Sequence, residues 1–184
     1  MEFITTPLPD AYLIEPSPVT DNRGWFSRIY CKEEYAAIAP AIDWVQFNNS
    51  FTNRSGSVRG MHYQLNPFGE IKLIRCISGS VYDVIIDVRQ DSPTFLKWFG
   101  AILSSDSRIM MFVPQGFAHG FQTLTDNCEL IYAHTSSYKP GYEGAIRYND
   151  PAIGIVWPLG VTEISERDQT HPFLTNEFKG IKKI

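Results

Sequence analysis

The sequence predicts an all-β domain, a sandwich or a barrel, and three observations support this prediction. β-Branched and aromatic residues recur in short runs separated by turn residues, a pattern typical of sandwiches and barrels. Aromatic residues make up 14% of the chain and the mean hydropathy is only −0.16, so rings in strands must supply much of the core. A helical pattern is found only in one short segment.

The expected elements follow one another along the chain. The first 30 residues contain apolar fragments among prolines, which favours extended edge strands over helix. Residues 32–38 are predicted to form a short helix that ends before Pro40. Strands are predicted at residues 72–77, 80–88, 98–103 and 109–113. Residues 138–157, rich in Gly, Pro, Tyr and Asp, are predicted to form turns.

The strand at residues 80–88 carries two carboxylates. Its two-residue period places Asp83, Ile85 and Asp87 on one face and Val84 and Ile86 on the other. Because a charge on a buried strand is costly unless it is paired, Asp83 is expected to have a partner.

Length and charge restrict the class of protein. The 184 residues fit one domain, residues 1–184, because two domains would each be small. The net charge is −4 and no Lys/Arg cluster precedes Lys179, which argues against a nucleic-acid partner. No apolar stretch approaches the roughly 20 residues that span a bilayer, and no signal segment opens the chain. We therefore expect a cytoplasmic protein without a membrane partner.

The cysteines indicate neither a disulfide framework nor a metal site. Cys31, Cys76 and Cys128 are odd in number and widely spaced, and no CxxC pair occurs. We expect three reduced thiols.

Two blocks place polar residues within otherwise apolar, β-rich sequence, as a barrel does when it lines a pocket. Residues 58–64 (VRGMHYQ) contain Arg59 and His62, with Lys72 close behind, and residues 112–121 (FVPQGFAHGF) contain His119. A guanidinium and an ammonium suit a phosphate, and a histidine beside them exchanges protons near neutral pH. The pattern predicts an anionic ligand with transferable protons. Gly60, Gly116 and Gly120 are expected to serve tight turns and close packing.

Ordered blocks along almost the whole chain carry a family resemblance. They are residues 21–26, 46–50, 59–64, 72–75, 91–95, 114–121, 157–159 and 165–168. At these residues the chain resembles the dTDP-4-dehydrorhamnose 3,5-epimerase family, which are metal-free enzymes that invert sugar carbons flanking a 4-keto group. The resemblance implies a cupin-type double-stranded β-helix (jelly-roll barrel) with short peripheral helices. It also implies a nucleotide-diphosphate sugar as substrate and no cofactor.

The reaction requires a base, an acid and a group that steadies an enolate. His62 is the best available base, and Lys72, on a face that is apolar elsewhere, is a plausible enolate stabiliser. The resemblance implies Asp168 as the partner of His62, with Asp83 as the alternative, although a Ser-x-x-Asp pattern also caps helices. It further implies Tyr132 as the proton donor.

Further residues are expected to bind the substrate. Arg59 and Arg23 are candidates for the phosphates, with His119, Gln46 and Asn48 beside them. The resemblance adds Tyr138 as a second pocket tyrosine, and the remaining substrate-binding candidates are Arg28, Glu143 and Arg167. It also implies a homodimer in which residues 1–30 exchange between subunits, so that Arg23 serves the neighbouring pocket.

A metal centre is not expected. His62 stands alone in its block, His119 is the one later histidine in register, and neither His134 nor His171 makes the HxH spacing that a first-row metal site favours.

Three departures from the family pattern lie on the nucleotide side. Arg28 stands where a glutamate is common, residues 48–54 are one residue longer, and Phe47 replaces a common acidic residue. They leave open which nucleotide carries the sugar. The position of inversion also remains open: C3 and C5, C3 alone or C5 alone. Two alternatives come from other classes of protein, a non-catalytic nucleotide-sugar-binding barrel and a metal-dependent cupin.

Overall fold

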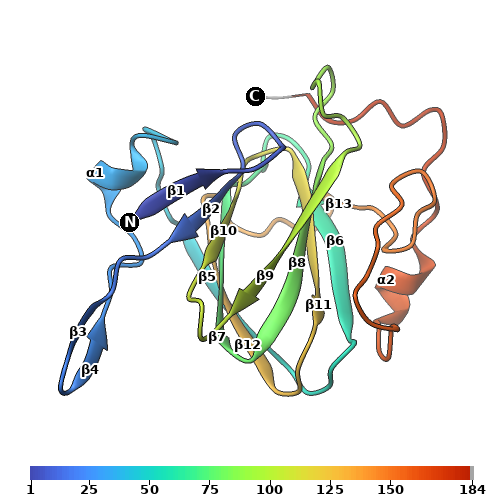
Figure 1. Cartoon of the computed structure of the whole chain (residues 1–184). Coiled ribbons are helices and arrows are strands. Elements are labelled where there is room, and N and C mark those ends of the chain that lie inside the picture. Colours follow the sequence, from blue (N-terminus) through green and yellow to red (C-terminus); the bar gives the residue numbers. More distant parts are fainter. Residues whose placement is uncertain (183–184) are drawn as a thin grey trace.

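The computed structural model describes residues 1–182, and these residues form one β-rich body (Figure 1). The strands are β1 Glu2–Thr5, β2 Tyr12–Glu15, β3 Val19–Asp21, β4 Gly24–Phe26, β5 Gln46–Thr52, β6 Val58–Gln64, β7 Lys72–Ser78, β8 Ser80–Asp87, β9 Trp98–Ser104, β10 Met110–Val113, β11 Phe117–Thr123, β12 Cys128–His134 and β13 Glu143–Ala145. The helices are α1 Lys32–Tyr35 and α2 Glu166–Thr170. The all-β prediction is confirmed.

The strands form two main antiparallel sheets. One has the order β1-β2-β10-β7-β12-β5, and the other has the order β13-β6-β11-β8-β9. A core of buried side chains from both sheets includes Ile74 and Leu130 of the first and Val81, Ile85 and Phe121 of the second. Burial of this apolar surface is the main force that holds the sheets face to face.

The four predicted strands agree with β7, β8, β9 and β10 to within about two residues, as is usual for element ends. The predicted helix is shorter than expected, because α1 ends at Tyr35. Beyond it, the Ala37 and Ile38 amides donate to carbonyls three residues earlier, which is a turn that leads to Pro40. Residues 138–157 form turns apart from β13.

The two faces of β8 are used as predicted. Val81 and Ile85 point into the core between the sheets, whereas Val84 and Ile86 belong to a second buried cluster that also contains Ile153 from the C-terminal segment. Asp83 is fully buried, and its partner is His119. Both faces of this strand are therefore covered.

Glycine permits a close approach of the neighbouring strands β6 and β11. Gly60 has φ +134°, and a Cβ atom placed on it would lie 2.5 Å from the Gly120 Cα atom. A side chain at either position would push the two backbones apart. The predicted packing role of these glycines is confirmed, and it sets the position of His62, two residues further along β6.

The N-terminal segment divides into two parts. β1 pairs with β2 and β2 with β10, so these strands belong to the sheet of their own chain. The β3–β4 hairpin projects from the body (Figure 1). Its Val19 and Phe26 side chains are 72% and 76% exposed. The exchange of residues 1–30 between subunits stays a prediction.

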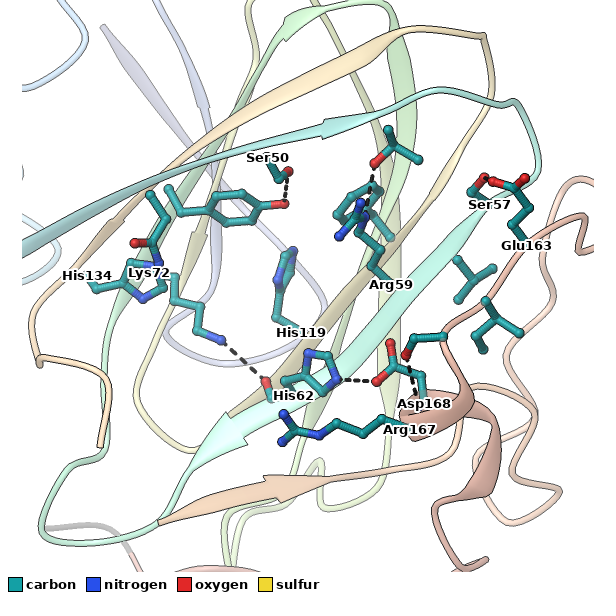
Figure 2. A pocket seen from close by; sticks show the side chains of 17 residues that line it. Ser50, Ser57, Arg59, His62, Lys72, His119, His134, Glu163, Arg167 and Asp168 are labelled. Carbon is teal, nitrogen blue, oxygen red and sulfur yellow. Dashed lines mark hydrogen bonds and ion pairs between the residues drawn. The ribbon is translucent and has the colours of Figure 1, made fainter. Parts of the chain in front are cut away.

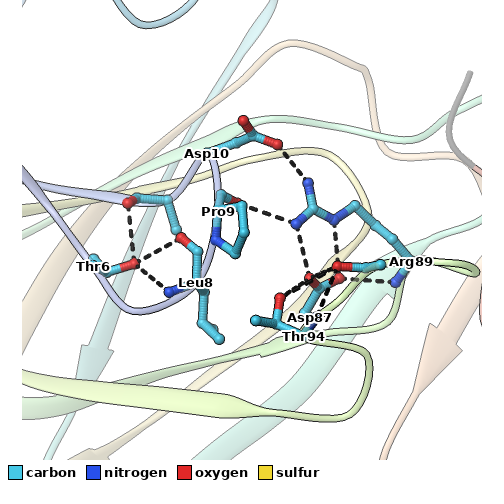
Figure 3. Close-up of polar contacts among 9 residues, drawn as sticks. Thr6, Leu8, Pro9, Asp10, Asp87, Arg89 and Thr94 are labelled. Carbon is cyan, nitrogen blue, oxygen red and sulfur yellow. Dashed lines mark hydrogen bonds and ion pairs between the residues drawn. The ribbon is translucent and has the colours of Figure 1, made fainter.

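An ion cluster built on the buried side chains of Asp87 and Arg89 fixes the loop between β1 and β2 (Figure 3). The Arg89 guanidinium donates from Nε and Nη2 to Asp87 at 2.9 and 2.8 Å, and from Nη1 to Asp10 at 2.6 Å. Ser92 and Thr94 each donate to Asp87 Oδ2 at 2.6 Å. The cluster joins the N-terminal loop to the end of β8.

No helix within residues 1–182 is long and apolar enough to cross a bilayer.

Candidate active site

A cavity of about 600 Å³ opens between the two sheets and is closed on one side by α2 and the residues before it (Figure 2). Its lining comes from β5, β6, β7, β11, β12 and the segment 163–168. A neighbouring cavity of about 400 Å³ shares five of its residues. The shared residues are Asn48, His62, Lys72, His134 and Arg167.

His62 and Asp168 form a hydrogen-bonded pair. His62 Nε2 lies 2.7 Å from Asp168 Oδ1, while the Gly60 amide donates to Asp168 Oδ2 at 3.2 Å. Burial opposes ionisation of Asp168, but the hydrogen bonds and charge of His62, with the Gly60 amide, outweigh it and hold the pKa below its usual range. A carboxylate on Nε2 favours the tautomer with the proton there, which leaves Nδ1 to accept a proton.

Helix α2 delivers Asp168 to this position. The Ser165 hydroxyl caps the helix by accepting from the Asp168 amide at 3.1 Å. The cap and the pairing with His62, which sequence reasoning weighed as alternatives, therefore both exist. Asp83, the other candidate orienter, is held by His119 Nε2 at 2.8 Å instead.

Tyr132 lines the cavity from β12, in the sheet opposite His62. Its hydroxyl lies 3.0 Å from Ser50 Oγ. Burial raises the pKa of Tyr132 and the Ser50 hydrogen bond only partly offsets this, so the phenol is protonated at neutral pH. The His119 ring lies beside the phenol, with ring centroids 6.1 Å apart.

Lys72 is buried in the same cavity, as its apolar strand face predicted. Its Nζ atom lies 3.3 Å from the His62 carbonyl oxygen and 3.2 Å from Glu70 Oε1. Glu70 also contacts His134 Nδ1 at 2.8 Å, and His134 Nε2 lies 3.2 Å from the Asn48 amide. Burial opposes ionisation of Glu70, but hydrogen bonding to His134 and the charge of Lys72 keep its pKa below the usual value.

Sequence reasoning missed Glu70, His134 and Ser50. A signal existed for His134, because the two-residue period of a strand places it on the face of Tyr132. Glu70 lies before the start of β7, where the strand period does not apply. The two-residue period also marks Ser50, which follows Gln46 and Asn48 on one face of β5 and meets Tyr132 from the neighbouring strand β12.

The predicted substrate-binding residues fall into two groups. Arg59 lines the larger cavity, and its guanidinium is steadied by the Thr52 hydroxyl at 3.0 Å and the Phe51 carbonyl at 3.1 Å. His119 is buried in the interior of that cavity, beside Tyr132, and not at its rim. Gln46, Asn48, Tyr138, Glu143 and Arg167 line the smaller cavity. Glu143 there accepts from Arg167 Nη2 at 3.2 Å and from the Tyr138 hydroxyl.

Arg23 and Arg28 do not line either cavity of their own chain. Arg23 pairs with Asp21 at 2.5 Å and Arg28 with Glu34 at 2.5 Å, and both guanidinium groups are exposed. They lie on and beside the projecting β3–β4 hairpin, away from the barrel interior (Figure 1). Substrate binding by either arginine would need a second copy of the chain. Both arginines lie within residues 1–30, the segment predicted to exchange between subunits, and substrate binding by either one stays a prediction.

One cluster of metal-binding groups occurs among residues 1–182. His62, Asp168 and His171 each offer a ligand atom, and these atoms lie within 4.8 Å of one another. The sequence spacing argued against His171 as a metal ligand, but the end of α2 places His171 next to the His62–Asp168 pair.

Comparison with known proteins places these residues in context. The family model for dTDP-4-dehydrorhamnose 3,5-epimerase matches residues 5–176. The dTDP-4-dehydrorhamnose 3,5-epimerase of Salmonella typhimurium is 39% identical over 95% of this chain and 96% of its own.

Solved structures agree with this match. A Legionella pneumophila dTDP-6-deoxy-D-glucose-3,5-epimerase in complex with dTDP-4-keto-L-rhamnose has a TM-score of 0.90, 33% identity and coverage of 100% of this chain and 99% of its own. A 3′-monoepimerase from Streptomyces bikiniensis in complex with dTDP-quinovose has a TM-score of 0.85, 31% identity and coverage of 92% and 86%. The cupin-type fold expected from the sequence is confirmed.

Proposed function

This chain belongs to the dTDP-4-dehydrorhamnose 3,5-epimerase family, and on that premise we propose that it epimerises dTDP-4-dehydro-6-deoxyglucose at C3 and C5, giving dTDP-4-dehydrorhamnose. The relatives bear this activity in their names, and a solved relative holds dTDP-4-keto-L-rhamnose. The product would supply deoxysugar or surface-polysaccharide biosynthesis.

The observation that carries the proposal is a base and an acid on opposite sheets of one cavity. His62, oriented by Asp168, comes from β6, and the protonated phenol of Tyr132 comes from β12. Inversion at a carbon needs a proton removed from one face and returned to the other. A binding module would have no use for such a pair.

The proposed steps conserve all atoms. His62 Nδ1 takes the proton from the carbon beside the ketone, and the electron pair of the C–H bond moves into an enolate. Lys72, with its charge held in a buried position, stabilises the enolate oxygen. Tyr132 then donates its proton to the opposite face, and solvent returns a proton to the phenolate and receives the proton from His62. These are proton transfers alone, so the reaction requires no cofactor.

Two cations suit the diphosphate. Arg59 presents its guanidinium at the wall of the larger cavity (Figure 2), and Arg167 lines both cavities. His119 lies next to Tyr132 and is better placed for the sugar than for the phosphates.

Solvent deuterium incorporation tests the reaction. The protein is incubated in D₂O with dTDP-4-dehydro-6-deoxyglucose, and each carbon is read by NMR. Label at both C3 and C5 is expected. Label at C3 alone would indicate the monoepimerase activity for which the Streptomyces bikiniensis relative is named, and label at C5 alone the remaining variant. If no deuterium were incorporated with any of several nucleotide carriers, the proposal would be refuted and the binding module favoured.

A homodimer is proposed from the exposed apolar surface of the β3–β4 hairpin and of β5, where Phe47 and Phe51 are 66% and 52% exposed. Such a surface on a protein of this size is typical of a protein interface. Sedimentation of the wild type and of Phe26→Asp distinguishes a dimer that the variant weakens from a monomer in both cases. The cytoplasmic location stays a prediction.

A further inference from the structure

His171 has no part in the proposed reaction, yet the fold holds it against the base. It directly follows α2, and its ring meets the His62 ring edge to face with centroids 6.4 Å apart. We propose that His62, Asp168 and His171 bind a first-row divalent metal ion, Zn²⁺ above all, and that the bound ion inhibits the enzyme. The metal site stands on its own geometry, and the inhibition rests on the proposed function.

The ligand atoms are close to the spacing that the ion requires. Asp168 Oδ1 is 2.7 Å from His62 Nε2 and 3.9 Å from His171 Nε2. Zinc binds imidazole nitrogen at about 2.0–2.1 Å and carboxylate oxygen at about 2.0–2.2 Å, which puts tetrahedral ligands about 3.4 Å apart. Binding would therefore widen the His62 contact and shorten the His171 contact, each by less than about 1 Å. Small side-chain rotations supply such shifts.

The three atoms are also chemically available. His171 Nε2 is buried, and it has no hydrogen-bond partner within residues 1–182. Because the Gly60 amide donates to Asp168 Oδ2, Oδ1 is left to face both histidines. Arg167, the nearest guanidinium on α2, pairs with Glu143 at 3.2 Å.

The donor set selects the kind of ion. Two imidazoles and one carboxylate with an open fourth position suit Zn²⁺ and its first-row neighbours, whereas Mg²⁺ prefers oxygen ligands in octahedral geometry. The open position would hold water.

Inhibition follows from the tautomer of His62. The reaction needs the ring proton on Nε2, next to Asp168, so that Nδ1 can accept a proton from the sugar. A metal ion on Nε2 takes the lone pair of that nitrogen, and the single ring proton of the neutral imidazole then moves to Nδ1. With Nδ1 protonated, His62 cannot act as a base. The ion also removes the Asp168 carboxylate from its hydrogen bond with the ring.

Calorimetry and activity together test the proposal. Chelator-treated protein is titrated with Zn²⁺, with Co²⁺ as a spectroscopic substitute and with Mg²⁺ as the negative control. We expect about one Zn²⁺ per chain, a tetrahedral Co²⁺ visible spectrum, no Mg²⁺ binding, and loss of deuterium exchange that a chelator reverses. ¹⁵N NMR of the His62 ring is expected to show the proton shift from Nε2 to Nδ1.

The decisive variant is His171→Ala, with Thr170→Ala as the matched control from the adjacent position. His171→Ala is expected to keep wild-type turnover in chelator and to lose Zn²⁺ affinity by about tenfold or more, whereas Thr170→Ala behaves as the wild type. Zinc that inhibits the wild type and His171→Ala equally would overturn the site, as would the absence of stoichiometric binding. Zinc that binds without slowing exchange would overturn the inhibition. A wild type that binds Zn²⁺ but has no epimerase activity would refute the proposed function and leave the metal site intact.

Discussion

His62 can act as a base only while one ring nitrogen is held protonated and the other is free. The 2.7 Å contact from Asp168 Oδ1 to Nε2 meets this condition, and the lowered pKa of Asp168 keeps the carboxylate ionised through neutral pH. Tyr132 meets the complementary condition, because burial raises its pKa and keeps the phenol protonated. At the scale of single residues, opposite environments thus set one group as acceptor and the other as donor.

Replacing Asp168 tests the orientation of the base. Asp168→Asn is expected to lower kcat by about 10²–10⁴-fold with little change in KM, because an amide on Nε2 permits the wrong tautomer. Asp106→Asn, which removes an exposed carboxylate on a turn, serves as the control and should leave kcat unchanged. Steady-state kinetics measures both. A kcat for Asp168→Asn within twofold of the wild type would contradict the pairing as part of the mechanism.

Replacing Tyr132 separates proton removal from inversion. In Tyr132→Phe, His62 can still remove a proton and return a deuteron to the same face, so exchange without inversion is expected to continue while inversion falls by about 10²–10⁴-fold. NMR of the recovered sugar in D₂O measures label and configuration in one sample. Tyr148→Phe, outside both cavities, is the control. Equal loss of exchange and inversion in Tyr132→Phe would mean that the phenol is not the second proton donor.

At the scale of elements, β7 and β12 lie side by side and bring three ionisable groups together. Lys72 begins β7, Glu70 precedes it by two residues, and His134 ends β12 in register with Lys72. The side chains of Lys72 and Glu70 are each 9% exposed, so neither charge is well solvated. This cluster holds the Lys72 ammonium in place before substrate enters.

Removing one charged partner from the Lys72–Glu70–His134 cluster is expected to lower the stability of the fold. Glu70→Gln leaves the Lys72 ammonium without its buried counter-charge, and we expect a loss of about 3 kcal/mol in the free energy of unfolding. Thermal unfolding measures this, at roughly 2–4 °C per kcal/mol for a chain of this size. The double variant Glu70→Gln/Lys72→Met should be more stable than Glu70→Gln alone, since it removes the uncompensated charge. A double variant that loses the sum of both single losses would show that the two side chains do not interact.

At the scale of the whole molecule, the Arg89–Asp87 cluster ties the first residues of the chain to the end of β8 (Figure 3). Asp87 is fully buried. Burial opposes its ionisation, but hydrogen bonds from Arg89, Ser92 and Thr94 outweigh this and hold its pKa below the usual range. The stability that the pair contributes is therefore present above the unfolded-state pKa of Asp, about 3.9, and is lost as the pH falls through the lower folded-state pKa.

Removing Arg89 is expected to reverse the direction in which the pKa of Asp87 is shifted. Arg89→Leu leaves Asp87 buried without its cation, so we expect a loss of about 3–5 kcal/mol at pH 7. Without the guanidinium, burial raises the pKa of Asp87, and the deficit relative to the wild type should shrink as the pH is lowered towards 5. Thermal unfolding from pH 5 to 8 measures it. Arg54→Leu, which removes an exposed guanidinium, should change stability by less than about 0.5 kcal/mol. A deficit independent of pH would contradict this account.

The sequence by itself determined the β class, the four strands β7 to β10 and most of the cavity residues. Strand periodicity placed Asp83 and Lys72 on buried faces, because side-chain direction in a strand depends on local backbone geometry alone. The family blocks contain His62 and Asp168, and the resemblance also pointed to Tyr132.

Only the tertiary structure decided which groups meet. It assigned Asp168 to His62 and Asp83 to His119, although both carboxylates were available to either histidine by sequence. It brought Glu70 to His134 and His171 to Asp168. These outcomes depend on how the two sheets cross and where α2 packs, and such long-range packing has no counterpart in the local spacing of residues.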